Sequence, residues 1–232
     1  MDTQLKALTP AKPGLELDLI ADFTCPWSFL GKRRLEQALE SVYGAPVLAL
    51  RWHGLRVQES GQVMWQQYLA SRLPPGVDVA LTERALLEAG AALDIGFRFD
   101  LIERVPDTLE AHRFMKLAAR EGRQSDLADA VFHAFFEQGR DIGDPKVLAD
   151  IGSALGVTAS VADAFADEAQ GRSEVAGEEQ RLRSLGVAAV PNLLVNGHIL
   201  VPGPAEVSTY VQAIDQALFP QLTAPADRHA LH

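Results

Sequence analysis

The chain has 232 residues, of which 47% are hydrophobic and 22% charged, values that exclude intrinsic disorder, collagen and coiled coil as its main state. Twenty-one Lys and Arg against 31 Asp and Glu give a formal net charge of −10, so we expect no unaided binding to nucleic acid or to an anionic membrane. No apolar run approaches the ~18 residues of a membrane span, and the first fourteen residues lack the apolar core of a signal peptide. A single cysteine excludes an internal disulfide, so we expect a cytoplasmic protein.

The N-terminal part of the chain predicts a strand, a helix and a second strand. Apolar residues alternate with polar ones over residues 15–21, which is typical of a strand. Apolar residues then recur at helical spacing from Phe29 to Val42, and a short apolar run over 47–52 predicts a buried strand. A strand, a helix and a strand in this order usually form a right-handed unit with parallel strands.

Residues 61–185 show helical spacing throughout and predict a block of about five helices. Ser125 is a predicted N-cap of one helix, and Asp144 of another, because Pro145 suits the first helical position.

The period returns to two after Gly186. Apolar runs over 193–195 and 199–201 flank Asn196-Gly197, which predicts a hairpin with a type I′ turn. A closing amphipathic helix follows over 207–218, and the tail after Pro220 is expected to fray.

These elements predict the α/β class, with a four-stranded mixed sheet and helices on both of its faces. We expect one domain made of residues 1–60 and 186–232, and a helical insertion over residues 61–185.

Cys25 is the sharpest chemical feature, because it lies between the first strand and a helix that begins at Pro26. A thiolate at a helix N-terminus is stabilised by free N–H groups and by the helix dipole, which predicts a lowered pKa and a nucleophile at neutral pH. The structural alternative is that a lone cysteine packs as a small buried hydrophobe.

Neighbouring residues are candidates for positioning the thiol. Ser28, one turn after Cys25, can donate a hydrogen bond to the thiolate. Trp27 either forms an apolar wall beside the sulfur or simply packs in the core, and the sequence favours neither. Val190-Pro191 directly precedes the hairpin. A trans proline at the start of a strand is the common case at such a position. The functional alternative is a cis proline that brings the backbone of Val190 beside Cys25.

His112 is a candidate cleft residue within the helical block, although a core or solvated histidine is the commoner explanation. The six histidines show no metal-ligand spacing, and we expect no metal. Motifs of serine hydrolases, zinc proteases and nucleotide-binding loops are absent from the sequence.

Three segments carry a family resemblance, namely FTCPWSFLGKRRLEQAL (23–39), GVAAVPNLLVNGHIL (186–200) and residues 107–157. They resemble the DsbA-like thioredoxin-fold family, in particular its FrnE-type branch, which is related to 2-hydroxychromene-2-carboxylate isomerase and to kappa-class glutathione transferases. The resemblance implies a thioredoxin-like fold with a large all-helical insertion, Cys25 as the nucleophile, a cis Pro191 and thiol–disulfide exchange. It also suggests a homodimer.

Ser28 stands where the dithiol members of this family have a second cysteine. Cys25 can therefore form only mixed disulfides, which predicts monothiol exchange on a small-molecule thiol or protein disulfide. Glutathione is then the expected co-substrate, and no tightly bound cofactor is expected.

Two alternatives stay open. One is a glutathione-dependent isomerase or transferase acting on an aromatic or polyketide-like molecule, although the related enzymes have serine where this chain has Cys25. The other is a thioredoxin-fold binding protein without catalysis, for which we expect an ordinary or raised thiol pKa.

Overall fold

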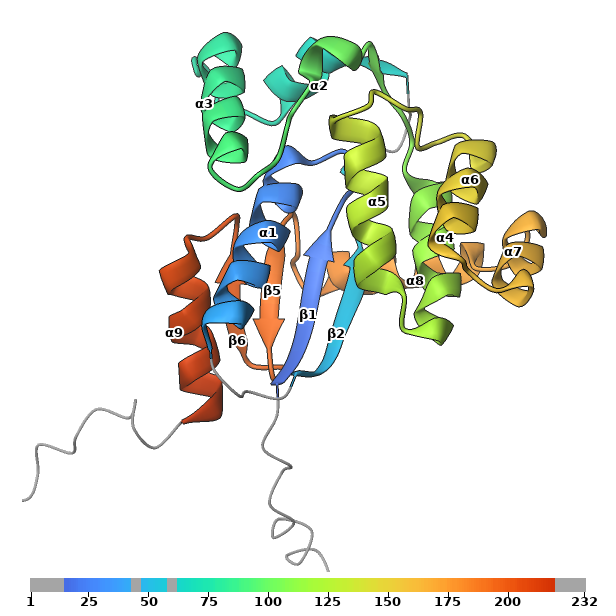
Figure 1. Ribbon diagram of the computed structural model, residues 1–232. Helices are drawn as coiled ribbons and strands as arrows, with labels where there is room; N and C mark the ends of the chain where they lie inside the picture. The colour runs from blue at the N-terminus through green and yellow to red at the C-terminus, as the bar shows by residue number, and fades with distance from the viewer. Residues whose placement is uncertain (1–14, 43–46, 58–61, 220–232) are drawn as a thin grey trace, which may run out of the picture.

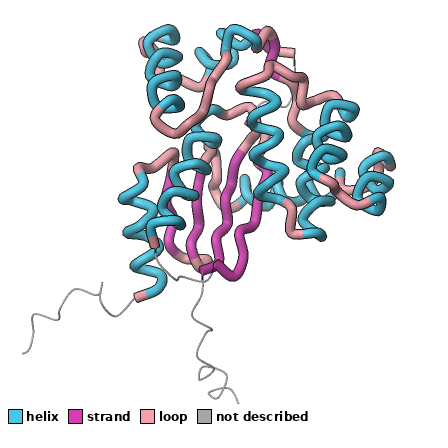
Figure 2. The backbone as a smooth tube through the Cα atoms, in the orientation of Figure 1, coloured by secondary structure: helices cyan, strands magenta, loops and turns pink. Residues whose placement is uncertain are grey.

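The computed structural model describes residues 15–42, 47–57 and 62–219. Four strands stand side by side in one sheet in the order β2–β1–β5–β6 (Figure 2). β1 pairs in parallel with β2 and antiparallel with β5, and β5 pairs antiparallel with β6. The strands are β1 (Leu15–Ala21), β2 (Val47–Gly54), β5 (Asn192–Val195) and β6 (Ile199–Pro202). The predicted α/β class and the four-stranded mixed sheet are confirmed.

β1 is one of the two central strands, and its alternation separates the two faces of the sheet. Leu15, Leu17 and Leu19 are at most 1% exposed and point into the main core. On the other face, Ile20 packs with Leu182 in a smaller apolar cluster. Both faces of this strand are therefore covered.

The hairpin between β5 and β6 has the predicted turn. Asn196 and Gly197 both have positive φ, at 50° and 72°, and the N–H of His198 donates to the carbonyl of Val195 at 3.2 Å. Positive φ at both central residues defines a type I′ turn. Asn196 also receives a hydrogen bond on Oδ1 from the N–H of Glu16 at 2.8 Å, which ties the turn to the start of β1.

Helices cover the sheet from both sides (Figure 1). α1 (Pro26–Ser41) and α9 (Val207–Leu218) pack together on one face, and α8 (Arg172–Ser184) contacts β2 on the other. A Cβ added at Gly31 would lie 3.2 Å from Cγ of Pro191. Glycine at this position thus lets α1 approach the loop before β5 closely.

The chain between β2 and β5 is mainly helical, as predicted, with seven α-helices within the described residues. They are α2 (Trp65–Ser71), α3 (Val79–Ala91), α4 (Leu109–Ala118), α5 (Gln124–Phe136), α6 (Pro145–Leu155), α7 (Ala159–Ala166) and α8. Two short strands, β3 (Val63–Met64) and β4 (Arg104–Val105), also pair there. The division into domains stays a prediction, and its junction at residues 60 and 61 lies outside the described residues, as does the tail expected to fray.

Of the two predicted helix caps, one is confirmed and one is wrong. Asp144 caps α6 and accepts a hydrogen bond from the N–H of Lys146 at 2.9 Å. α5 begins at Gln124 and its N-cap is Arg123, so Ser125 lies within the first turn.

Aromatic side chains join the sheet to the helical segment. Phe23 stacks on Trp52 with ring centroids 4.8 Å apart, and Phe29 stacks on Phe132 of α5 at the same distance. Since Phe23 and Phe29 flank the turn from β1 to α1, this packing fixes the segment that carries Cys25.

Candidate active site

Cys25 is the N-cap residue of α1, and Pro26 occupies the first turn of the helix. The backbone of Cys25 is extended, with φ −89° and ψ 111°, and its carbonyl accepts a hydrogen bond from the N–H of Ser28 at 3.0 Å. Only 4% of Cys25 is exposed. The predicted position of the cysteine at the start of the helix is confirmed.

The acidity of the Cys25 thiol differs from the sequence-based expectation. Burial raises its pKa to about 11, and the negative charge of Asp22 acts in the same direction. The hydroxyl and N–H of Ser28 and the N–H of Trp27 oppose this rise. The predicted lowering of the pKa is therefore wrong for this structure, because the loss of hydration outweighs the donors at the helix N-terminus.

Val190 and Pro191 lie beside Cys25. The peptide bond between them is cis, and Sγ of Cys25 donates to the carbonyl oxygen of Val190 at 3.8 Å. The predicted cis proline next to the cysteine is confirmed. The raised pKa favours the protonated thiol, which is the form that can donate to this carbonyl. Trp27 is half-buried and packs against the main core.

A buried carboxylate lies three residues before the thiol. Asp22 is fully buried, and four donors surround it: Thr108 Oγ1 at 2.7 Å and His112 Nε2 at 3.2 Å on Oδ1, Val57 N at 2.8 Å and Thr24 Oγ1 at 3.3 Å on Oδ2. Burial opposes ionisation, but the hydrogen bonds outweigh it and lower the pKa of Asp22. The structure thus holds a negative charge close to Cys25.

His112 lies in the core rather than in a cleft. It is 1% exposed, and its Nδ1 accepts a hydrogen bond from Nε1 of Trp52 at 3.4 Å. The ring hydrogen therefore lies on Nε2 and points at Asp22.

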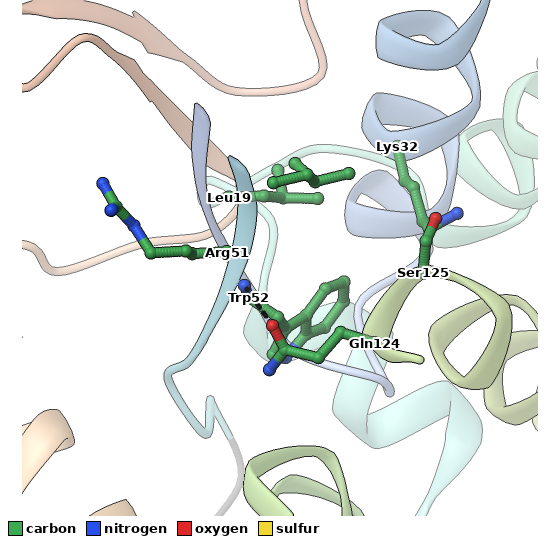
Figure 3. A pocket seen from close by; sticks show the side chains of 7 residues that line it. Leu19, Lys32, Arg51, Trp52, Gln124 and Ser125 are labelled. Atoms are coloured by element: carbon green, nitrogen blue, oxygen red, sulfur yellow. Dashed lines mark hydrogen bonds between the residues drawn. The ribbon is translucent and has the colours of Figure 1, made fainter. Parts of the chain in front are cut away.

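A small cavity lies apart from Cys25, between β1, β2, α1 and α5 (Figure 3). Its volume is about 10 Å³, which is the space of a single water. Lys32 lines it, and the dashed line in Figure 3 marks the bond from Trp52 N to Gln124 Oε1. The cavity is too small for a cofactor.

Within residues 15–42, 47–57 and 62–219, no group of three His, Cys, Asp or Glu side chains could hold a metal ion. In the same part of the chain, no helix is long and apolar enough to cross a membrane.

The sequence profile of the DSBA-like thioredoxin domain family matches residues 16–215. The chain belongs to this family. Among solved structures, it resembles the probable DsbA oxidoreductase SCO1869 of Streptomyces coelicolor, with a TM-score of 0.75 and 24% identity over 88% of this chain and 89% of the other.

Two further solved structures share the fold at lower similarity. The cytosolic disulfide reductase DsbM of Pseudomonas aeruginosa, solved with GSH, has a TM-score of 0.56 and 22% identity over 89% of this chain and 97% of the other. A 2-hydroxychromene-2-carboxylate isomerase has a TM-score of 0.61 and 14% identity over the same shares of the two chains. The thioredoxin-like fold implied by the sequence motifs is thereby confirmed.

The structure adds residues to the site of this DsbA-like protein that the sequence analysis missed. Asp22 and Thr24 flank Phe23 directly before the cysteine. The sequence position of Asp22 could have marked it as a site residue, because it is an acidic residue at the end of a buried strand and directly before the Cys25 motif.

Proposed function

We propose that this DsbA-like protein catalyses monothiol exchange through Cys25, with glutathione as the second thiol. The observation that carries the proposal is the sulfur of Cys25 at the start of α1, 3.8 Å from the carbonyl of Val190 next to a cis proline. Cys25 is the only cysteine of the sequence, so the second sulfur of each exchange must come from another molecule.

In the proposed cycle, the Cys25 thiolate attacks one sulfur of a substrate disulfide. A bond forms between Cys25 and that sulfur, the substrate disulfide breaks, and the other half leaves as a thiolate. A glutathione thiolate then attacks the substrate sulfur of the mixed disulfide. This step releases the Cys25 thiolate and leaves a disulfide between glutathione and the substrate.

Ser28 supports the charged sulfur in this cycle. Its hydroxyl and N–H, with the N–H of Trp27, lower the pKa of the thiol against the effect of burial. With a pKa of about 11, only about one thiol in ten thousand is ionised at pH 7. We therefore expect exchange to be slow at neutral pH and to accelerate about tenfold per pH unit.

One related protein and the cysteine count of this chain support glutathione and a cytoplasmic location. DsbM, which shares the fold, is a cytosolic disulfide reductase solved with GSH. A chain with one cysteine also suits a reducing compartment, because it has no internal disulfide to form.

The test is the reaction of the folded protein with oxidised glutathione at several pH values, followed by intact mass. We expect one glutathionyl adduct, reversed by reduced glutathione, and formed faster as the pH rises. The Cys25→Ser variant serves as the matched control and should form none. An adduct that appears only after unfolding would refute the proposal.

The raised pKa of the Cys25 thiol favours a second candidate, a binding protein without catalysis. That candidate predicts that the folded protein does not turn over a mixed disulfide of glutathione and a small thiol. The isomerase or transferase alternative instead predicts saturable binding of glutathione without modification of Cys25.

A further inference from the structure

His53, near the end of β2, bonds to a carboxylate through each of its ring nitrogens. Its Nδ1 lies 2.8 Å from Oε1 of Glu178 on α8, and its Nε2 lies 2.8 Å from Oδ1 of Asp18 on β1. An ionised carboxylate only accepts hydrogen bonds, so both ring nitrogens carry a hydrogen and the ring is an imidazolium. These three residues form the His53 bridge.

The His53 bridge joins the sheet to α8, which contacts β2 on the face opposite α1 (Figure 1). Glu178 is buried, and its Oε2 also accepts a hydrogen bond from the N–H of Gly54 at 3.2 Å. One helical turn further along α8, Leu182 packs with Ile20 and Leu55. A charged contact and an apolar contact, one turn apart, therefore hold α8 on the sheet.

The apolar contact extends to the loop beside the thiol. Val190 packs against the cluster that contains Leu182, and the N–H of Val187 donates to the carbonyl of Leu182 at 3.0 Å. The carbonyl of Val190 in turn accepts a hydrogen bond from Sγ of Cys25 at 3.8 Å. Direct contacts therefore lead from the His53 bridge through α8 to Cys25.

We infer that the His53 bridge positions Val190 against Cys25 and releases it when the imidazolium loses its proton to water or hydroxide at alkaline pH. A neutral imidazole keeps one hydrogen, so one of the two carboxylates then faces a lone pair. The ring also loses the charge that attracts both carboxylates. α8 is then held less firmly on the sheet, and so is the loop that ends at Val190.

Other charged groups surround the two carboxylates of the bridge. Arg51 of β2 bonds to Asp18. Lys116 of α4 bonds to Oε1 of Glu178, and Arg181 of α8 lies 3.7 Å from the same oxygen. Burial lowers the pKa of the bridging imidazole, and so does Lys116, but the bonds to Glu178 and Asp18 outweigh both and raise it above 6.5. The bridge is therefore complete below pH 6.5 and is lost as the pH rises through the folded pKa.

Release of Val190 makes the thiol more reactive for two reasons. The neutral thiol loses the carbonyl to which it donates, and Cys25 gains access to water, which reduces the burial that raises its pKa. Reactivity then rises by more than the tenfold per pH unit that ionisation of the thiol alone gives. The inference rests on the proposed function, since it gives exchange at Cys25 a second and separate dependence on pH.

The test compares His53→Gln with His198→Gln as the matched control. His198 lies in the turn between β5 and β6, where its Nδ1 bonds to the carbonyl of Asn196 at 2.8 Å. Alkylation of the folded proteins is followed from pH 6 to pH 10, and the rate that global unfolding allows at each pH, obtained from urea unfolding, is subtracted. Hydrogen exchange of residues 182–190, corrected for the intrinsic effect of pH, reports on the loop without using the thiol.

For His53→Gln we expect alkylation about tenfold faster than in wild type at pH 6, the scale of one hydrogen bond. Its rate should then rise evenly, by about tenfold per pH unit. The wild-type rate should rise more steeply and reach that of the variant once the histidine has lost its proton. At pH 6, residues 182–190 should exchange faster in His53→Gln, and His198→Gln should match wild type in both measurements.

Equal alkylation rates in His53→Gln and wild type from pH 6 to pH 10 would overturn the inference. A wild-type rate that rises by no more than tenfold per pH unit would do the same. So would equal exchange of residues 182–190 in both proteins, or alkylation fully accounted for by global unfolding. If oxidised glutathione forms no adduct while alkylation and hydrogen exchange change as expected, the proposed function fails and the role of the His53 bridge stands.

Discussion

Replacing Asp22 with asparagine is the perturbation with the clearest calculated outcome. The carboxylate is fully buried and accepts two hydrogen bonds on each oxygen. An amide keeps one acceptor oxygen and turns the other into a donor. In one orientation the new NH₂ faces the backbone N–H of Val57, and in the other it faces the Nε2–H of His112. Neither of these two donors can turn away.

The cost follows from those contacts. Asp22→Asn loses at least one hydrogen bond to a charged group and leaves a fixed donor unsatisfied, for a destabilisation of about 3 kcal/mol. The variant also removes the negative charge that raises the pKa of Cys25. We therefore expect a less stable protein whose thiol is more acidic than the wild-type thiol.

The assay is urea unfolding of both proteins as a function of pH, together with alkylation of the folded forms. The hydrogen bonds lower the pKa of Asp22 below 3.8 in the folded state. Its contribution is therefore complete above that value and is lost as the pH falls through the folded pKa. The difference in unfolding free energy between the wild type and Asp22→Asn should therefore decrease below about pH 4. A difference that is constant from pH 7 to pH 3, or alkylation slower than wild type, would refute the reasoning.

Two further predictions concern the neighbourhood of β2. In Gly54→Ala, the new Cβ would lie 2.4 Å from Nδ1 of His112, so we expect a loss of about 1–3 kcal/mol from overpacking; calorimetry showing an unchanged Tm would contradict it. Burial lowers the pKa of His53, but its bonds to Glu178 and Asp18 outweigh burial and raise it. Its contribution to stability should be complete below pH 6.5 and lost as the pH rises through the folded pKa. In His53→Gln that decline should be absent from the unfolding free energies between pH 6 and pH 9.

Local patterns in the sequence were enough to predict the elements of the sheet. The alternation of residues 15–21 and the Asn196-Gly197 turn depend on backbone geometry and near neighbours, and both were confirmed. The predicted cap at Ser125 was wrong, because the helix begins one residue earlier, at Gln124. Gln124 bonds to Trp52 N, 72 residues away in sequence, and no local pattern reports such a contact.

The same distinction applies to the candidate site. The position of Cys25 at the start of α1 follows from a strand, a proline and a helix in sequence. Its acidity depends on burial and on Asp22, and burial depends on how α1 packs within the fold. The sequence pattern indicated the helix N-terminus, which lowers the pKa of the thiol. It did not indicate the burial of Cys25, which raises that pKa by more.

We propose that Cys25 alone carries exchange between disulfides and glutathione. The most direct measurement is steady-state turnover of a mixed disulfide of glutathione and a small thiol, with both substrates varied. A ping-pong mechanism through one covalent intermediate predicts parallel lines in double-reciprocal plots of rate against substrate concentration. It also predicts a rate that increases with pH and a complete loss of turnover in Cys25→Ser. Intersecting plots, or turnover that survives in Cys25→Ser, would contradict the account.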